Sequence, residues 1–372
     1  MIQTIVRLHK KIHERPIVFL GAFFFVLTCV YAGLFIFDFL PATFKANSVF
    51  FGPLLLLLTA TPWVIFSLLS TLGDAGVGYV DEYLLKEIKK TGDTNTDAPG
   101  RLLLLSGFFG FVVLSITAVV SLFLGAEYSI FVTLESFLLS ISAGFLEVLW
   151  LIPYFYALQR GGALNTTPLF QTVPIFSLIF GLILFSEVPV PLHILATFLI
   201  IAGAALLNYS PVSRKLDVIS ILLMLASSAT ISMGYFIFKD ATESGNFVAS
   251  VFGNGLGMAL CSTLIWMFWK PYRQQFNQFI QSFTWKIFTL QFSNESLYAV
   301  SAVLGQLAIV LGPSVMIVSA FSAFHPLFTL LIGLCITKFG VDEASNSLSG
   351  PRLIAKTVAI ILISTGTFVI FI

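Results

Sequence analysis

Long apolar runs separated by short polar stretches make up most of this chain. Each run has about 20 residues or more, enough for an α-helix to cross the roughly 30 Å of hydrocarbon in a bilayer. In lipid the backbone polar groups must be satisfied within the segment, so such runs predict membrane-spanning helices. The pattern predicts an all-α polytopic membrane protein with eleven spans, at residues 17–39, 47–72, 102–124, 130–157, 166–186, 190–209, 216–238, 246–268, 285–311, 314–337 and 353–372.

The composition excludes a soluble globular protein. Hydrophobic residues make up 58% of the 372 residues and charged residues only 10%, and the mean hydropathy is +0.98. A water-soluble chain of this length cannot bury so much apolar surface. The three cysteines, Cys29, Cys261 and Cys335, all fall inside predicted spans and lack metal or disulfide spacing. We therefore expect them to act as small apolar residues.

Basic residues predict the orientation in the membrane. If the polar segments alternate between the two sides, seventeen of the nineteen Lys and Arg residues share the side of the N-terminus, and the other side holds Lys45 and Lys239. The positive-inside rule then places the N-terminus in the cytoplasm and the C-terminus outside, in a plasma or inner membrane. The basic stretch before the first span predicts a short interfacial helix, and no small-residue cleavage site follows it.

One segment occurs twice. Residues 174–182 read PIFSLIFGL and residues 326–334 read PLFTLLIGL, with the same Pro, Phe, Leu and Gly positions. Each copy precedes an apolar helix with a central glycine, Gly203 in the first and Gly366 in the second. A duplicated membrane bundle is typical of secondary transporters, whose related halves move around a shared central site.

The duplication predicts three parts of the chain. Residues 1–46 hold the interfacial segment and an extra span, 47–209 form the first five-helix repeat, and 210–372 form the second. With the orientation derived from charge, paired helices run in opposite directions, which predicts inverted repeats. Counting 17–39 as the first helix of the repeat is the alternative register, and only this argument from direction excludes it.

The repeat region also carries a family resemblance. YFYALQRGGALNTTPLFQTVPIFSLIFGLILFSEVPV is followed by LATFLIIAGAALL, with an Ala-Leu pair, small residues, a Pro in the fourth helix and Ser186-Glu187 at its end. On these residues the chain resembles the drug/metabolite transporter superfamily, in its ten-helix form with two EamA-type halves, over roughly 47–372. The second copy keeps the Pro but ends in Lys338-Phe339-Gly340, and the leading helix is additional.

Two acidic residues in predicted spans are the main site candidates. Glu147 and Glu295 lie near the middle of the third helix of each repeat, and Asn294 adjoins Glu295. A carboxylate at that depth costs at least ~2.5 kcal/mol, so it rarely faces lipid. We predict a substrate or proton site lined by both halves; the alternative is a protonated Glu bonded to a neighbouring helix.

Further candidates accompany the two prolines. Pro174 and Pro326 are expected to kink their helices, because proline lacks a backbone donor. His325 precedes the second proline and either satisfies local backbone groups or relays protons to Glu295. Gln171 takes a similar place before the first proline, and Tyr154 is an aromatic candidate for lining a cavity. Residues 78–100 are expected to form a solvated cytoplasmic loop.

These features predict a secondary transporter for a small neutral, zwitterionic or cationic organic metabolite, such as an amino acid, an amine or a drug-like molecule. An intramembrane enzyme, a channel and a nucleotide-sugar antiporter are the alternatives, but none of the usual enzyme motifs is present. No cofactor, metal or catalytic residue is expected. The expected partners are the small-molecule substrate and the lipid bilayer, not nucleic acid, and a homodimer is left open.

Overall fold

The computed structural model describes most of the two predicted repeats and none of the leading helix. The described residues are 62–90, 99–124, 129–161, 167–187, 190–208, 218–281, 285–325, 327–329, 331–332, 358–359, 361–363, 365–366 and 369. The predicted spans 17–39 and most of 47–72 therefore lie outside the described residues, as do Pro326 and most of 353–372.

Every regular element in this part of the chain is a helix. In chain order they are α5 (Pro62–Lys90), α6 (Pro99–Phe108), α7 (Gly110–Leu124), α8 (Leu134–Leu149), α9 (Leu151–Gly161), the 3-10 helix η2 (Thr167–Thr172), α11 (Val173–Leu184), α12 (Pro191–Asn208), α13 (Val218–Glu243), α14 (Phe247–Phe268), α15 (Lys270–Gln281), α16 (Trp285–Leu311), α17 (Val315–Ala320) and the 3-10 helix η3 (Phe321–Phe324).

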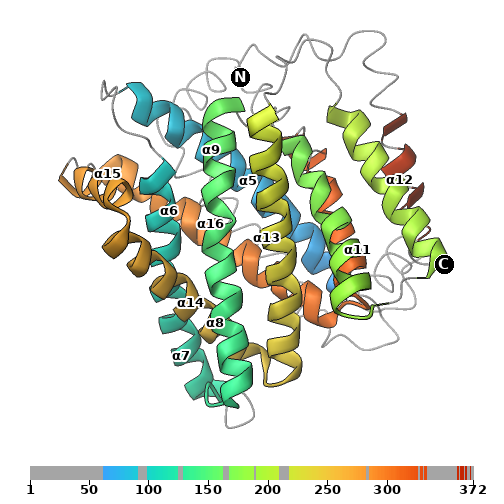
Figure 1. Cartoon of the computed structure of the whole chain (residues 1–372), viewed down its shortest axis with the longest axis horizontal. Coiled ribbons are helices and arrows are strands. Elements are labelled where there is room, and N and C mark those ends of the chain that lie inside the picture. The colour runs from blue at the N-terminus through green and yellow to red at the C-terminus, as the bar shows by residue number, and fades with distance from the viewer. Residues whose placement is uncertain are drawn as a thin grey trace, which may run out of the picture.

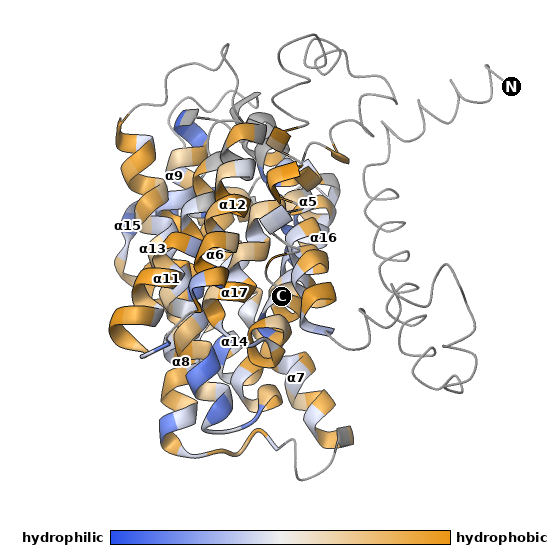
Figure 2. Ribbon diagram, turned by 90° about the vertical axis from the view of Figure 1, so that its right-hand side faces the viewer, coloured by the Kyte–Doolittle hydropathy of each residue, from blue (hydrophilic) through white to orange (hydrophobic). Residues whose placement is uncertain are grey.

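The predicted all-α membrane fold is confirmed. Six of the described stretches are helical and both long and apolar enough to cross a bilayer, and three shorter apolar helices lie among them. The bundle presents large apolar side chains outward, such as Leu122, Phe123 and Phe131, each more than four-fifths exposed. Figure 2 shows the same apolar character along most of the ribbons. Lipid is the medium in which such a surface is stable.

Several predicted spans are broken helices. The span predicted at 130–157 consists of α8 and α9, which meet at Trp150. Pro153 follows three residues later and cannot donate the backbone bond that a continuous helix needs there. In the span predicted at 166–186, η2 precedes α11, and Pro174 stands in the first turn of α11. Proline is well suited to that position because the first amides of a helix have no partner within it.

One prediction was wrong. Residues 78–100 were expected to form a solvated loop, but α5 continues to Lys90. Leu84 is only 1% exposed, and the Tyr79 hydroxyl donates to the Thr329 carbonyl oxygen at 2.8 Å. The acidic residues in this stretch suggested solvent, but Asp81 is buried among partners from other helices. The polar segment between α14 and α16 is likewise helical and forms α15.

The helices cross closely in the middle of the bundle. In Figure 1, α8 and α13 lie side by side near its centre, with α14 beside α8, while α16 lies along α5. The spans predicted as the fifth helix of each repeat, 190–209 and 353–372, also meet at Gly203 and Gly366. A Cβ added to Gly203 would lie 2.8 Å from the Ala359 oxygen, and one added to Gly366 would lie 2.7 Å from the Ala196 oxygen. The contact is reciprocal, since Gly366 and Ala359 follow Gly203 and Ala196 at one constant offset.

Candidate functional site

Three helices bring four carboxyl groups into the interior of the bundle. α5 carries Asp74 and Asp81, which are two helical turns apart on one face, α8 carries Glu147, and α16 carries Glu295. Asp81 and Glu295 are each 5% exposed. A buried acid in a membrane helix is rarely retained without a function, because each one destabilises the helix in lipid unless it finds partners.

Asp81 and Glu295 form the first of two polar centres. The Asn294 amide donates to Asp81 Oδ1 at 2.8 Å, and the Tyr154 hydroxyl donates to Asp81 Oδ2 at 3.3 Å. The Ser106 hydroxyl donates to Glu295 Oε1 at 2.8 Å. The two carboxyl groups are close enough to interact electrostatically. Three predicted candidates, Glu295, Asn294 and Tyr154, therefore converge on an aspartate that sequence reasoning had placed in a loop.

Glu147 and Asp74 form the second centre. The Tyr298 hydroxyl donates a hydrogen bond to Glu147 Oε1. Asp74 lies within electrostatic reach of Glu147, and Tyr235 lies within reach of both acids. Each predicted glutamate is thus paired with an aspartate of α5. The two centres adjoin, because Ser106, the partner of Glu295, lines the same small cavity as Glu147.

His325 belongs to the second centre. Its Nδ1 lies 3.3 Å from Thr329 Oγ1, and the same hydroxyl donates to the His325 carbonyl oxygen at 2.8 Å. Its ring lies 6.1 Å from that of Phe170 and within hydrogen-bonding reach of the Asp74 backbone. Among the described contacts of His325, none is with Glu295.

The remaining predicted residues are less informative. Gln171 lies in η2, and its side chain is outside the described part. Pro174 lies in the first turn of α11 and is buried. Pro326 is outside the described residues. The predicted kink at that proline stays a prediction.

Sequence reasoning missed Asp74 and Asp81 because both lie beyond the predicted end of their helix. The signal that could have found them is their spacing. The two acids are seven positions apart, so a helix continued through LGDAGVGYVDEYLL presents both on one side. Tyr298, the partner of Glu147, is one of several aromatic residues in the spans, and nothing in the sequence sets it apart from ordinary packing residues.

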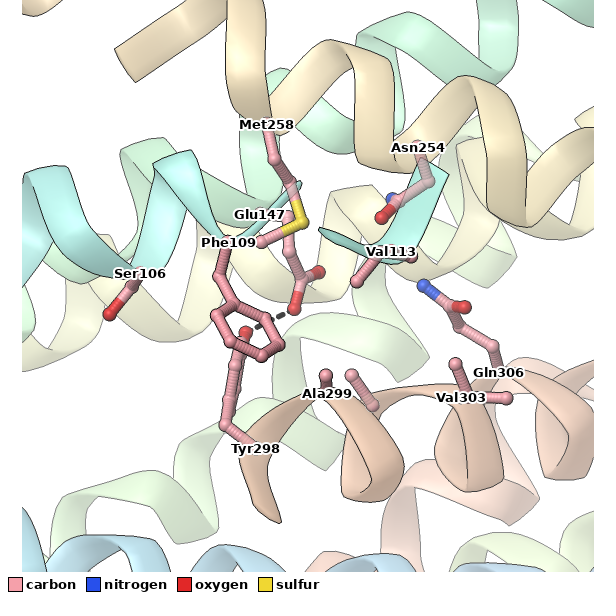
Figure 3. A pocket seen from close by; sticks show the side chains of 11 residues that line it. Ser106, Phe109, Val113, Glu147, Asn254, Met258, Tyr298, Ala299, Val303 and Gln306 are labelled. Carbon is pink, nitrogen blue, oxygen red and sulfur yellow. Dashed lines mark hydrogen bonds between the residues drawn. The ribbon is translucent and has the colours of Figure 1, made fainter. Parts of the chain in front are cut away.

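A small cavity opens beside Glu147. It is lined by residues of α6, α8, α14 and α16 and by Val113 of α7. Figure 3 shows the Glu147 carboxyl group at the cavity, with the amides of Asn254 and Gln306 toward its other side. Its volume of about 20 Å³ holds about one water molecule.

The described residues near these acids offer no cation to balance them. In the described part of the chain, Lys239 forms an ion pair with Glu187 at 3.6 Å, near the C-terminal end of α13. No group of three or more His, Cys, Asp and Glu side chains among the described residues could hold a metal ion. The site therefore presents carboxylate oxygens, hydroxyls and amides, which suit a ligand that donates hydrogen bonds or carries positive charge.

Comparison with known proteins finds a family model that matches part of this chain. The model of the EamA-like transporter family matches residues 88–209. The chain carries an EamA-like transporter unit. That family is part of the drug/metabolite transporter superfamily, so the resemblance drawn from the sequence is confirmed. The match includes α8, which carries Glu147, and α9, which carries Tyr154.

Solved structures share the fold of this chain. Seventeen solved chains match it. One of them, described only as a crystal structure of a protein, is 18% identical with a TM-score of 0.53, and the match covers 79% of this chain and 94% of that chain. At this identity the likeness shows the fold alone. No curated protein matches the chain. The six helices long and apolar enough to cross a bilayer, together with the match to the EamA-like transporter family over residues 88–209, support an integral membrane protein.

Proposed function

We propose that this EamA-like protein is a secondary transporter that carries a small organic amine or amino acid by alternating access. The observation that supports this substrate class is the set of four inward-facing acids, Asp74, Asp81, Glu147 and Glu295, to which no described Lys or Arg is paired. Phosphates and nucleotide sugars are anions and would be repelled there, whereas an ammonium group donates strong hydrogen bonds to carboxylates.

Glu147 is the proposed recognition residue. Its Oε1 accepts from Tyr298, which leaves the other carboxylate oxygen for the substrate. When an ammonium group binds, its N–H groups donate to Glu147 and the charges balance. When the substrate leaves, an unpaired carboxylate in the membrane is costly, so Glu147 takes a proton. Proton and amine would then exclude each other at one site, which couples their movements.

Transport by purified protein in proteoliposomes tests the proposal. Pools of radiolabelled amines and amino acids, with nucleotide sugars as the opposing class, would be assayed for uptake and for counterflow. Glu147→Gln and Asp74→Asn should each lower uptake at least roughly tenfold, since the charged acceptor is lost from the proposed site. Glu135→Gln is the matched control, because Glu135 is an exposed acid in the first turn of the same helix.

Two outcomes would overturn the proposal. Uptake of nucleotide sugars but not amines would contradict the substrate class. Wild-type amine uptake by both acid variants would show that the acids are structural. The mechanism would then depend on the aromatic and amide side chains of the bundle.

The orientation and the inverted repeats are part of the same proposal. The reciprocal contact of Gly203 and Gly366 supports a two-fold relation between the repeats 47–209 and 210–372. Together with the uneven basic residues, it supports eleven spans with the N-terminus inside. A C-terminal alkaline phosphatase fusion should be active and a green fluorescent protein fusion dark. The reverse pattern would contradict both the extra helix and the opposed pairing.

A further inference from the structure

The centre of Asp81 and Glu295 contains buried polar atoms without partners. The Asn294 side-chain oxygen has no hydrogen-bond partner, although the nitrogen of the same amide donates to Asp81. Gln291 lies within electrostatic reach of Glu295 and is 2% exposed, and both polar atoms of its side chain lack partners. Native structures seldom retain such atoms unless a ligand or water satisfies them. The two amide oxygens and the two carboxyl groups call for a ligand that donates hydrogen bonds.

The same centre also lacks a positive charge. The hydrogen bonds that its two carboxyl groups accept come from neutral groups, namely the Asn294 amide and the hydroxyls of Tyr154 and Ser106. Among the described residues, no ion pair joins either carboxyl group to a Lys or Arg. Neutral donors offset only part of the cost of a buried carboxylate, whereas an ammonium group supplies both charge and N–H groups.

Two acidic centres lie along one helix. Asp74 and Asp81 share a face of α5, seven positions and therefore about 10.5 Å apart along its axis. Asp74 belongs to the centre of Glu147. Ser106 connects the two centres, because it donates to Glu295 and lines the small cavity beside Glu147. Figure 3 draws Ser106 and Glu147 among the residues that line this cavity. The bundle thus presents two negative centres that adjoin.

We propose that the transported amine is a diamine that binds both centres at once. One ammonium group donates to Asp81 and Glu295. The other donates to Asp74 and Glu147. The inference rests on the proposed transport function and narrows its substrate class. A monoamine would balance the charge of one centre and leave the other without a cation.

The spacing of the aspartates along α5 restricts the length of the diamine. If each ammonium group donates a bond of about 2.8 Å to its aspartate, the spacing of about 10.5 Å leaves about 5 Å between the two nitrogens. With bonds of about 1.5 Å, a chain of about three or four carbons fills that distance. A short diamine therefore fits the two centres better than a long one.

The helices must separate to admit this ligand. The cavity where the centres adjoin has a volume of about 20 Å³, which holds about one water molecule. The bond from Ser106 to Glu295 joins α6 to α16 beside it. An ammonium group that donates to Glu295 can take the place of the Ser106 hydroxyl. Binding of the diamine would then release α16 from α6 without leaving the carboxylate unpaired.

Transport by the full-length protein in proteoliposomes tests the proposal through chain length. Uptake of radiolabelled diaminobutane would be measured in competition with unlabelled diaminopropane, diaminooctane and butylamine. Diaminopropane should compete at least roughly tenfold more strongly than butylamine, since it makes one more charged contact. Diaminooctane should compete more weakly than diaminopropane, because its nitrogens are too far apart for the two centres.

Variants locate the second ammonium group. Asp81→Asn and Glu295→Gln each remove a charge from the first centre at nearly the same volume. Each should lower the preference for diaminopropane over butylamine at least roughly tenfold. This ratio does not depend on how much protein folds, because both amines are compared on the same preparation. Asp240→Asn is the matched control, since Asp240 is an exposed acid near the end of α13, and it should keep the wild-type preference.

The outcomes separate the two proposals. A preference for short diamines that Asp81→Asn abolishes and Asp240→Asn keeps supports the diamine site. Equal competition by diaminopropane and butylamine would overturn the diamine site and leave the proposed amine transport standing, and so would a wild-type preference in both Asp81→Asn and Glu295→Gln. No uptake of any amine or diamine would overturn the proposed function and the diamine site with it.

Discussion

Two helix crossings that the predicted duplication makes equivalent differ in how they are built. In the first, α8 of the first repeat packs on α14 of the second through small residues. A Cβ added to Gly144 would lie 2.9 Å from the Gly257 Cα, so the two backbones are nearly in contact. In the second, α16 meets α6 through side chains. Phe109 and Phe292 have ring centroids 5.4 Å apart, and Ser106 donates to Glu295.

The difference indicates which crossing can move. Backbones packed at glycines can separate only by losing many van der Waals contacts at once, and small residues at such crossings are a common way to join helices in lipid. Side chains can change rotamer and partner without that loss. The small cavity also lies at the second crossing, between α16 and the junction of α6 and α7. We infer that α16 moves against α6 during transport while α8 and α14 move together.

The largest expected effect comes from locking the second crossing. In a chain whose three cysteines are replaced by alanine, Phe109→Cys and Phe292→Cys would be joined with a short bifunctional thiol reagent. Amine uptake should fall roughly tenfold or more when the helices are joined and should recover on reduction, since alternating access needs the crossing to open. The single variant Phe292→Cys, treated in the same way, is the control. Full uptake by the cross-linked protein would show that this crossing is static.

A larger side chain at the first crossing should lower the stability of the protein. Gly144→Ala forces a methyl group against the backbone of α14, and we expect it to destabilise the protein by roughly 1–3 kcal/mol. Gly78→Ala is matched to it, because a Cβ on Gly78 of α5 meets nothing within 4 Å, and alanine there should be neutral or stabilising by up to about 1 kcal/mol. Unfolding in detergent measures both. Equal stabilities of the two variants would contradict the close packing of α8 on α14.

The smallest effect concerns one hydrogen bond of the second crossing. Ser106→Ala removes the donor to Glu295 and should cost about 1 kcal/mol. Ser142→Ala is the control, since that exposed hydroxyl bonds only within its own helix, and its effect should stay within about 0.5 kcal/mol. A double-mutant cycle with Glu295→Gln isolates the pair. Additive effects in the cycle would mean that Ser106 does not hold Glu295 in the folded protein.

The sequence alone predicted that the chain lies in lipid, that its fold is all-α, and that Glu147 and Glu295, two of the four acids, are site candidates. Apolar runs long enough to cross a bilayer can be identified without knowing what packs against them, because each helix satisfies its own backbone. For the same reason Glu147 and Glu295 stood out, since each interrupts the middle of an apolar run. The duplicated proline segment pointed to the transporter family that the comparison confirmed.

Only the tertiary structure decided where α5 ends and which acids meet. An aspartate after an apolar run suggests a helix end, because burying a lone carboxylate in lipid is costly. Asp81 is buried because it accepts bonds from Asn294 and Tyr154, which are 213 and 73 residues away in the chain. No local pattern reveals such partners. The pairing of each glutamate with an aspartate of α5 depends on how whole helices pack, and their packing is set by side chains that are distant in the sequence.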